Sequence, residues 1–381
     1  IILFILGGLV LYIIAKDHTA EMKELENLLN QNQEMMAEKQ AEYASKLKEE
    51  QAAWDNVLSD LDNTESNLKE YVRNLPVIGI GDSVMLGAVT NLYQTFPNGY
   101  FDAKVSRTDY EAYGALNTLV NKGMLSDIIV FNLGTNGECP QSCKDQYLNL
   151  IGNRTLFWVN ATKPDYPIFN TRLINLANER DNVHIIDWIS ASQGHPEYFI
   201  SDGIHLTDSG RVAYAKTIYD SIYNYYLNEL NSKKERLMKQ HEDELKEKIT
   251  FYGNDLLLNA FNSIKENYPD ANYKINKNYN YQMLKDELTN DELTYKLVFI
   301  FDNKMNMSYD EYNELIDLCD NHEIYIIYMN NYDLANEKAK IINFSEYLKE
   351  HSEYLMVDKI HLTEDGNIAL SNTIKDMLEE E

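Results

Sequence analysis

Two segments of this 381-residue sequence recur in the same order further along the chain, and this repetition constrains the fold more than any other feature. The paired segments are Gly81–Ala88 with Gly253–Ala260, and Asp202–Gly210 with Asp358–Gly366. Self-similarity at this scale indicates one fold that is present twice, and the chain length suits two domains. We therefore predict two globular units, 76–226 and 249–381, joined by a charged helical linker at 227–248.

Apolar, β-branched runs alternate with helical stretches in the first of these units. The runs are Val77–Ile80, Phe101–Val105, Ile128–Leu133, Leu156–Val159 and Val183–Ile186. This alternation is typical of an α/β fold in which helices cover both faces of a parallel sheet. Binding and catalytic residues of such folds lie at the carboxyl ends of the strands. The loops that follow each run are therefore where we expect a site.

The sequence before residue 76 has a different character. Residues Ile1–Ala15 are apolar throughout and would span about 22 Å as a helix. We therefore predict that 1–16 is the end of a longer transmembrane helix, and a buried core helix is the alternative. Residues 17–75 carry apolar positions at helical spacing. We predict a helical stalk there, with a dimerisation helix as the alternative. Polar residues on the apolar stripe, such as Asn32 and Gln40, argue against a coiled coil.

The composition excludes several classes of function. The chain has 34 Lys and Arg residues against 61 Asp and Glu, which gives a net charge of −27. A nucleic acid or an anionic lipid surface requires a cationic face, so neither is an expected partner. Three cysteines are too few for a disulfide framework. Cys139 and Cys143 are either a local disulfide or two free thiols, and a metal site there is disfavoured because no His lies nearby.

Three polar residues in the loops of the first unit suit acyl transfer. Ser83 follows the first run, where a helix N-terminus favours developing negative charge. Asp202 and His205 lie together after the fifth run, and they can supply a base and the group that orients it. Taken singly, each residue has an ordinary structural role as a helix cap or a packed loop residue. Their joint occurrence in order after predicted strands favours a catalytic site.

Acyl transfer also needs donors for the oxyanion, and two further loops supply candidates. Gly134 and Asn136 follow the third run, and Ser106 follows the second. The side-chain amide of Asn136 and the backbone N–H of Ser83 are the donors that we predict. No metal ligand set and no cofactor motif accompanies these residues, so we expect neither a metal nor a cofactor.

These loops resemble the four blocks of the SGNH (GDSL-type) hydrolase superfamily. Ser83 matches the nucleophile, Asn136 the oxyanion residue, and Asp202 and His205 the Asp-x-x-His pair. The resemblance implies tandem three-layer α/β/α, flavodoxin-like domains. The sequence departs from the family at the second block, where Ser106 stands in place of the usual Gly.

The motifs are similar in particular to the extracellular domain of peptidoglycan O-acetyltransferases. The matching segments are Asp82–Met85, Val105–Arg107, Gly134–Gly137, Ile186–Trp188, Ser190–His195 and Asp202–Thr207. The resemblance implies a membrane-anchored protein of a Gram-positive bacterium with its globular units on the cell-wall side. It also implies an acetyl donor delivered by a membrane acyltransferase domain, and a cell-wall glycan acceptor. A surface carbohydrate esterase or deacetylase, and a non-enzymatic wall-binding protein, are the alternatives.

The second unit lacks the residues that this chemistry needs. Asp255 occupies the nucleophile position, and Asp302-Asn303-Lys304 replaces Gly134-Thr135-Asn136. Asp358 and His361 remain, which we attribute to loop structure and helix capping. We predict an inactive copy that packs on the first unit or binds glycan. Asp255 acting as a carboxylate nucleophile is the less favoured alternative.

Overall fold

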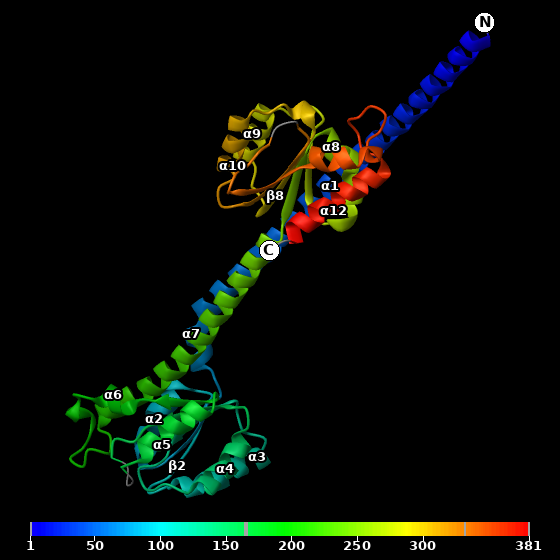
Figure 1. Cartoon of the computed structure of the whole chain (residues 1–381). Helices are drawn as coiled ribbons and strands as arrows, with labels where there is room; N and C mark the ends of the chain where they lie inside the picture. The colour runs from blue at the N-terminus through cyan, green and yellow to red at the C-terminus, as the bar shows by residue number, and fades with distance from the viewer. Residues whose placement is uncertain (1, 164–166, 331–332, 380–381) are drawn as a thin grey trace. The chain divides into compact units, whose positions relative to one another are not determined.

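The computed structural model describes residues 2–163, 167–330 and 333–379, with side chains from residue 19 onward. The chain divides into two compact units (Figure 1). Residues Val57–Glu235 form one, which we call the Ser83 unit, and Ile1–Asn56 with Arg236–Glu381 form the other, the Asp255 unit. Each contains a five-stranded sheet. The predicted α/β class with tandem parallel sheets is therefore confirmed.

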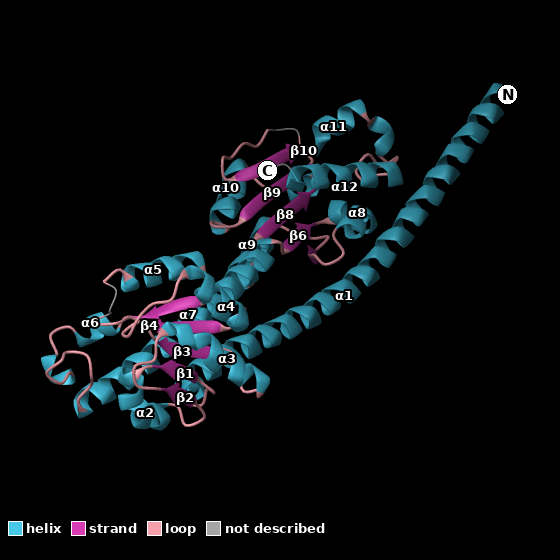
Figure 2. Cartoon of the chain, turned by 90° about the horizontal axis from the view of Figure 1, so that it is seen from below, coloured by secondary structure: helices cyan, strands magenta, loops and turns pink. Residues whose placement is uncertain are grey.

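The sheet of the Ser83 unit is entirely parallel. Its strands are β1 (Ile78–Gly81), β2 (Tyr100–Ala103), β3 (Ile128–Asn132), β4 (Thr155–Val159) and β5 (Val183–Ile186). Their order is β2-β1-β3-β4-β5, and part of this order can be followed in Figure 2. Gly81 at the end of β1 pairs with Ala103 on one side and Asn132 on the other. The loops after these three strands therefore start at the same edge.

Helices cover both faces of this sheet. They are α2 (Ser83–Thr95), η1 (Asp109–Glu111), α3 (Ala112–Asn121), α4 (Gln141–Ile151), α5 (Phe169–Glu179), α6 (Trp188–Ser192), η2 (Pro196–Tyr198) and α7 (Asp208–Lys246). Ile128 and Val130 of β3 join a core with α2 and α7. Ile129 and Phe131 join a second core with α3, α4 and α5. Because successive strand residues point to opposite faces, the unit has three layers.

The Asp255 unit repeats this topology. Its strands are β6 (Ile249–Gly253), β7 (Asn272–Ile275), β8 (Lys296–Phe301), β9 (Glu323–Tyr328) and β10 (Ala339–Asn343). Its other elements are α8 (Asp255–Asn267), α9 (Tyr281–Asn290), η3 (Asn303–Met305), α10 (Tyr309–Leu318), α11 (Phe344–Glu350), η4 (Ser352–Tyr354) and α12 (Glu364–Glu379). The strand order is β7-β6-β8-β9-β10, so the second strand along the chain again lies beside the first at the sheet edge.

Helix α1 (Ile2–Arg73) covers the segment for which the sequence predicted a stalk. Asn32 donates 2.8 Å to a carbonyl of α8, and Gln40 donates 2.6 Å to the Tyr273 carbonyl. These polar residues of the apolar stripe therefore bind backbone of the Asp255 unit. Further along α1, Leu68 and Val72 are buried in the core of the Ser83 unit. The helix thus supplies packing to each unit.

The predicted transmembrane segment 1–16 falls where side chains lie outside the described residues. In the part of the chain that the structure describes, no helix has an apolar stretch sufficient to cross a bilayer. The predicted linker 227–248 falls largely within α7, which continues without a break from the Ser83 unit.

Candidate active site

Ser83 lies at a tight turn between β1 and α2. The Asp82 carboxylate caps the helix, because its Oδ1 accepts the Val84 N–H at 2.9 Å. Ser83 is the first helical residue, where backbone N–H groups are unpaired and the helix dipole is positive. A Cβ on Gly81 would lie 2.4 Å from that of Met85, so the close approach of strand and helix needs glycine. The turn therefore presents the hydroxyl at the carboxyl edge of the sheet.

The loop before α7 brings the predicted base to this hydroxyl. Asp202 Oδ1 accepts the backbone N–H groups of Ile204 at 2.8 Å and His205 at 3.0 Å. Its Oδ2 lies 2.6 Å from His205 Nδ1, and His205 Nε2 lies 3.0 Å from Ser83 Oγ. With Nδ1–H donated to the carboxylate, the Nε2 lone pair faces the hydroxyl. The structure thus connects the three predicted residues in one line.

The charge state of this line follows from its hydrogen bonds. The His205 imidazole, followed by the backbone N–H groups of Ile204 and His205, lowers the pKa of Asp202 to about 2. Asp202 therefore stays ionised near neutral pH and can stabilise a positive imidazole. Asp82 is different, because burial raises its pKa to about 6 against the Val84 hydrogen bond. Two carboxyl groups next to Ser83 and His205 thus have opposite pKa shifts.

The loops after β2 and β3 are tied together beside this turn. The buried Arg107 guanidinium donates 2.8 Å to Asp102 Oδ1 and 3.4 Å to the Gly81 carbonyl. The Asn136 side-chain amide in turn donates 3.3 Å to the Arg107 carbonyl. This contact draws the second and third predicted blocks together. The role of Asn136 as an oxyanion donor stays a prediction.

The two remaining candidate residues have backbone conformations that are rare for L-residues. Gly134 has a φ of +114°, and a Cβ there would lie 2.2 Å from the Phe169 ring, so packing alone explains the glycine. Ser106, which stands where the family has Gly, has a φ of +55° and is exposed. Substrate-binding roles for Gly134 and Ser106 stay predictions.

A disulfide between Cys139 and Cys143 closes the loop after Asn136, which selects the first of the two alternatives left open by the sequence. The buried Asp109 carboxylate accepts the Cys139 N–H, and burial raises the pKa of Asp109 to about 6. The buried Glu138 carboxylate pairs with Lys144 of α4. These contacts fix the loop that carries the third block.

Sequence reasoning missed Lys163, which follows β4. Its Nζ donates to the Asp202 carbonyl, across 39 residues of sequence. No motif marks this lysine, because its only connection to the site is made by folding. Arg107 was noted only as the neighbour of Ser106, although its buried guanidinium connects two of the blocks.

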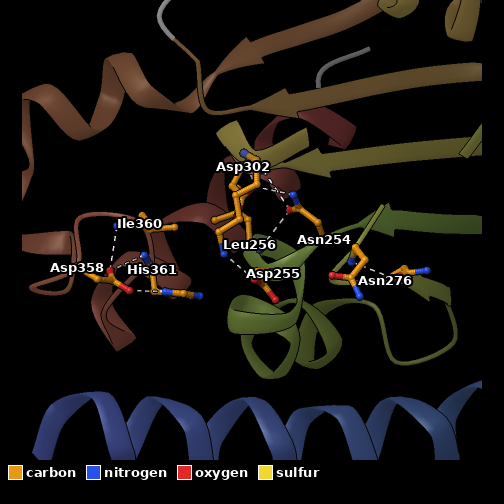
Figure 3. A network of polar contacts seen from close by, with 10 residues as sticks. Asn254, Asp255, Leu256, Asn276, Asp302, Asp358, Ile360 and His361 are labelled. Atoms are coloured by element: carbon orange, nitrogen blue, oxygen red, sulfur yellow. Dashed lines mark hydrogen bonds and ion pairs between the residues drawn. The ribbon is translucent and has the colours of Figure 1, made fainter. Parts of the chain in front are cut away.

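The matching loop of the Asp255 unit keeps the Asp–His geometry (Figure 3). Asp358 Oδ1 accepts the N–H groups of Ile360 at 2.9 Å and His361 at 3.0 Å, and Oδ2 lies 2.5 Å from His361 Nδ1. Asp255 opens α8 as Ser83 opens α2. Among the described residues, His361 Nε2 is buried and has no hydrogen-bond partner.

The residues opposite this Asp–His pair differ from those of the Ser83 unit. Lys304 Nζ lies 2.8 Å from Asp255 Oδ2 and forms an ion pair with it. The Asn254 amide, which caps α8, donates 2.6 Å to Asp302 Oδ1. Asp255 thus stands in place of the serine and Lys304 in place of the oxyanion amide, and a carboxylate that is paired with a lysine is a poor nucleophile. Over the described ranges, no three His, Cys, Asp or Glu side chains gather as metal ligands in either unit.

No protein-family model matches the chain. The O-acetyltransferase OatA of Staphylococcus aureus (strain NCTC 8325 / PS 47) is 33% identical over 171 residues, which cover 43% of this chain and 28% of OatA. The chain thus spans little more than a quarter of that relative. The resemblance predicted from the motifs is confirmed: the chain contains an SGNH hydrolase-like domain that resembles OatA.

Two solved structures each align with about two fifths of the chain. The C-terminal catalytic domain of Streptococcus pneumoniae peptidoglycan O-acetyltransferase A (OatA), with a methylsulfonyl adduct, is 22% identical and covers 40% of this chain and 94% of its own, with a TM-score of 0.36. The family 3 carbohydrate esterase of Clostridium thermocellum is 16% identical and covers 42% of this chain and 98% of its own, with a TM-score of 0.33.

Proposed function

We propose that the Ser83 unit is an extracytoplasmic serine acetyltransferase that modifies a hydroxyl of a cell-wall glycan. The observation that carries the proposal is the continuous line of contacts from Ser83 Oγ through His205 to Asp202, at 3.0 and 2.6 Å. A hydroxyl with a base in hydrogen-bond reach, and an orienting carboxylate behind that base, is the arrangement for nucleophilic acyl transfer. The likeness to the O-acetyltransferase OatA supports transfer of an acetyl group to an oxygen, and the motif resemblance described above supports a peptidoglycan acceptor.

The proposed reaction has two steps, acetylation of Ser83 and transfer of the acetyl group to the glycan. Ser83 Oγ attacks the acetyl carbonyl of the donor while His205 Nε2 takes the hydroxyl proton, and that proton then passes to the leaving group. In the second step the glycan hydroxyl gives its proton to His205 and attacks the acetyl-Ser83 ester. The bond from the acetyl carbon to Ser83 Oγ then breaks, and His205 returns the proton to Oγ as the acetylated glycan leaves. The Ser83 N–H and the Asn136 amide, with Ser106 nearby, are the proposed oxyanion donors.

Hydrolysis is the second candidate, because water can replace the glycan in the second step. The side chains of His205 and Asp202 are 44% and 38% exposed, so the acetyl-enzyme is accessible to water. The transferase reaction therefore requires an acceptor that covers the site. This open geometry favours a carbohydrate esterase whenever no acceptor is bound.

Further parts of the proposal rest on the apolar sequence of 1–16 and on the resemblance to peptidoglycan O-acetyltransferases. They are the membrane anchor formed by 1–16, a donor delivered by a membrane acyltransferase domain, and a Gram-positive cell-wall location. The Asp255 unit is proposed as a non-catalytic copy, since Lys304 holds its carboxylate. A purely wall-binding protein is the alternative if Ser83 proves unreactive.

The test uses a chromogenic acetyl ester with and without an added chitooligosaccharide. We expect ester cleavage, and acetylated sugar that appears at the expense of acetate. Ser83→Ala should lower the rate at least about 10³-fold, because the nucleophile is lost. Asp255→Ala is the matched control at the equivalent helix start and should leave the rate unchanged.

The outcomes separate the candidates. Acetate as the sole product at every sugar concentration would support the esterase and contradict the transferase. Full activity in Ser83→Ala would contradict the site assignment itself. An inactive wild-type protein that a serine-directed sulfonyl fluoride does not label would leave the wall-binding alternative.

A further inference from the structure

The loop that carries Asp202 and His205 has the same conformation in both units, although its second residue differs. Gly203 has a φ of +70°, and the matching Lys359 has a φ of +58°. The carboxylate of each loop accepts the two backbone N–H groups that follow, at similar distances. A lysine thus adopts the left-handed conformation that this turn requires. The turn alone does not explain why residue 203 is glycine.

Lys163 explains it. A Cβ at position 203 would lie 2.5 Å from Lys163 Nζ and 3.0 Å from its Cε. That ammonium group donates to the Asp202 carbonyl. A side chain at position 203 would therefore require the Lys163 ammonium group to shift from this place. Glycine leaves the space through which Lys163 reaches the backbone of Asp202.

We propose that Lys163 is a positioning residue that holds the Asp202–His205 loop in register with Ser83, and that residue 203 is glycine to admit it. The proposal rests on the proposed function of the Ser83 unit. The Asp202 and His205 side chains are partly exposed, whereas Leu206, which follows them, is buried in the core and anchors that end of the loop. Lys163, in the loop after β4, adds a charge-assisted hydrogen bond at the other end, at Asp202. The Lys163 contact is to backbone, so the lysine acts through the loop.

The first experiment replaces the lysine in the full chain. Lys163→Met should lower kcat for the chromogenic ester about tenfold, because a small displacement of His205 weakens proton transfer. KM should change less than about twofold, since the lysine orients the base and not the ester. Lys163→Arg keeps a cationic donor and should restore most of kcat. Rates are normalised to sites titrated with sulfonyl fluoride, so that unfolded protein does not count.

The second experiment tests the link to glycine with a double-mutant cycle. Gly203→Ala should cost about as much as Lys163→Met, and the double variant no more than either, because both changes remove one contact. Gly194→Ala is the matched control, since Gly194 has a φ of +81° and no atom within 4 Å of an added Cβ. It measures the cost of the backbone conformation alone, and kcat should stay within about twofold of wild type.

Two results would overturn the proposal. One is a wild-type kcat in Lys163→Met, and the other is losses in Lys163→Met and Gly203→Ala that multiply in the double variant. A rise in KM without a fall in kcat would instead identify Lys163 as a substrate contact and equally refute positioning. Failure of the proposed function is distinguishable, because then Ser83→Ala would keep the activity of the wild type.

Discussion

Asp82 is a fully buried carboxyl group, and its replacement by Asn is expected to change how stability depends on pH. One oxygen accepts the Val84 N–H, while Oδ2 has no partner among the described residues. Burial raises its pKa from 3.8 to about 6. The matching residue of the Asp255 unit is Asn254, which makes the same cap to Leu256 without a charge.

The sign and size of the effect follow from linkage. A carboxyl group with a raised pKa binds more protons in the folded state, so stability is highest below 3.8 and falls as pH rises towards 6. At about 1.4 kcal/mol per pH unit the loss approaches about 3 kcal/mol above pH 7. Asp82→Asn removes this loss, and an unpaired amide donor costs about 1–3 kcal/mol at every pH. We therefore expect the stability of Asp82→Asn relative to wild type to rise by about 2–3 kcal/mol between pH 4 and pH 7.5.

Urea unfolding at several pH values measures this difference. Trp158 and Trp188 report on the Ser83 unit, and Trp54→Phe removes the tryptophan of the other unit. Asp208→Asn is the matched control, since the Asp208 side chain is 99% exposed, and its effect should be nearly independent of pH. A relative stability of Asp82→Asn that stays constant from pH 4 to pH 7.5 would refute the reasoning from burial.

Two further predictions concern the supports of each unit. Replacing both Cys139 and Cys143 by Ser should lower the free energy of unfolding by about 2 kcal/mol, because the short disulfide no longer restricts the unfolded chain. Dithiothreitol should destabilise only the wild type, and equal destabilisation of both proteins by dithiothreitol would contradict this. Asn32→Leu removes the hydrogen bonds that this side chain makes with the Leu258 carbonyl and the Asn262 amide, and should cost about 1–3 kcal/mol in chemical unfolding. Asn30→Leu is the control, since Asn30 is exposed on the same helix, and it should change the free energy of unfolding by less than about 0.5 kcal/mol. Equal losses of stability in Asn32→Leu and Asn30→Leu would refute the role of the hydrogen bond.

The sheet and the line of polar residues were predictable because both depend on local sequence order. β5 coincides with the predicted run Val183–Ile186, and β3 differs from its run by one residue. Parallel strands place their carboxyl ends at one edge, so residues after different strands could be expected to meet. The strand predicted to end at Val105 ends at Ala103, before the left-handed turn at Ser106.

The contacts that were not predictable join segments far apart in sequence. Asn32 and Gln40 look like defects in a helical stripe, yet they bind backbone carbonyls more than 200 residues away. Lys163 has no neighbour in sequence that signals its contact with Asp202. A polar residue on an apolar face has meaning only once its partner is known. Such partners come from tertiary folding and not from periodicity.

The shared geometry of the two Asp–His loops has a consequence for what distinguishes the two copies. The Asp358–His361 loop adopts its conformation although no serine faces it, so the loop's own hydrogen bonds are sufficient to orient the imidazole. In the Ser83 unit the same hydrogen bonds orient the imidazole within its loop, so the restraint that we propose for Lys163 concerns the position of that loop relative to Ser83. The two copies therefore differ in the residues that begin α2 and α8 and in those that follow β3 and β8, while the conformation of the Asp–His loop is common to both.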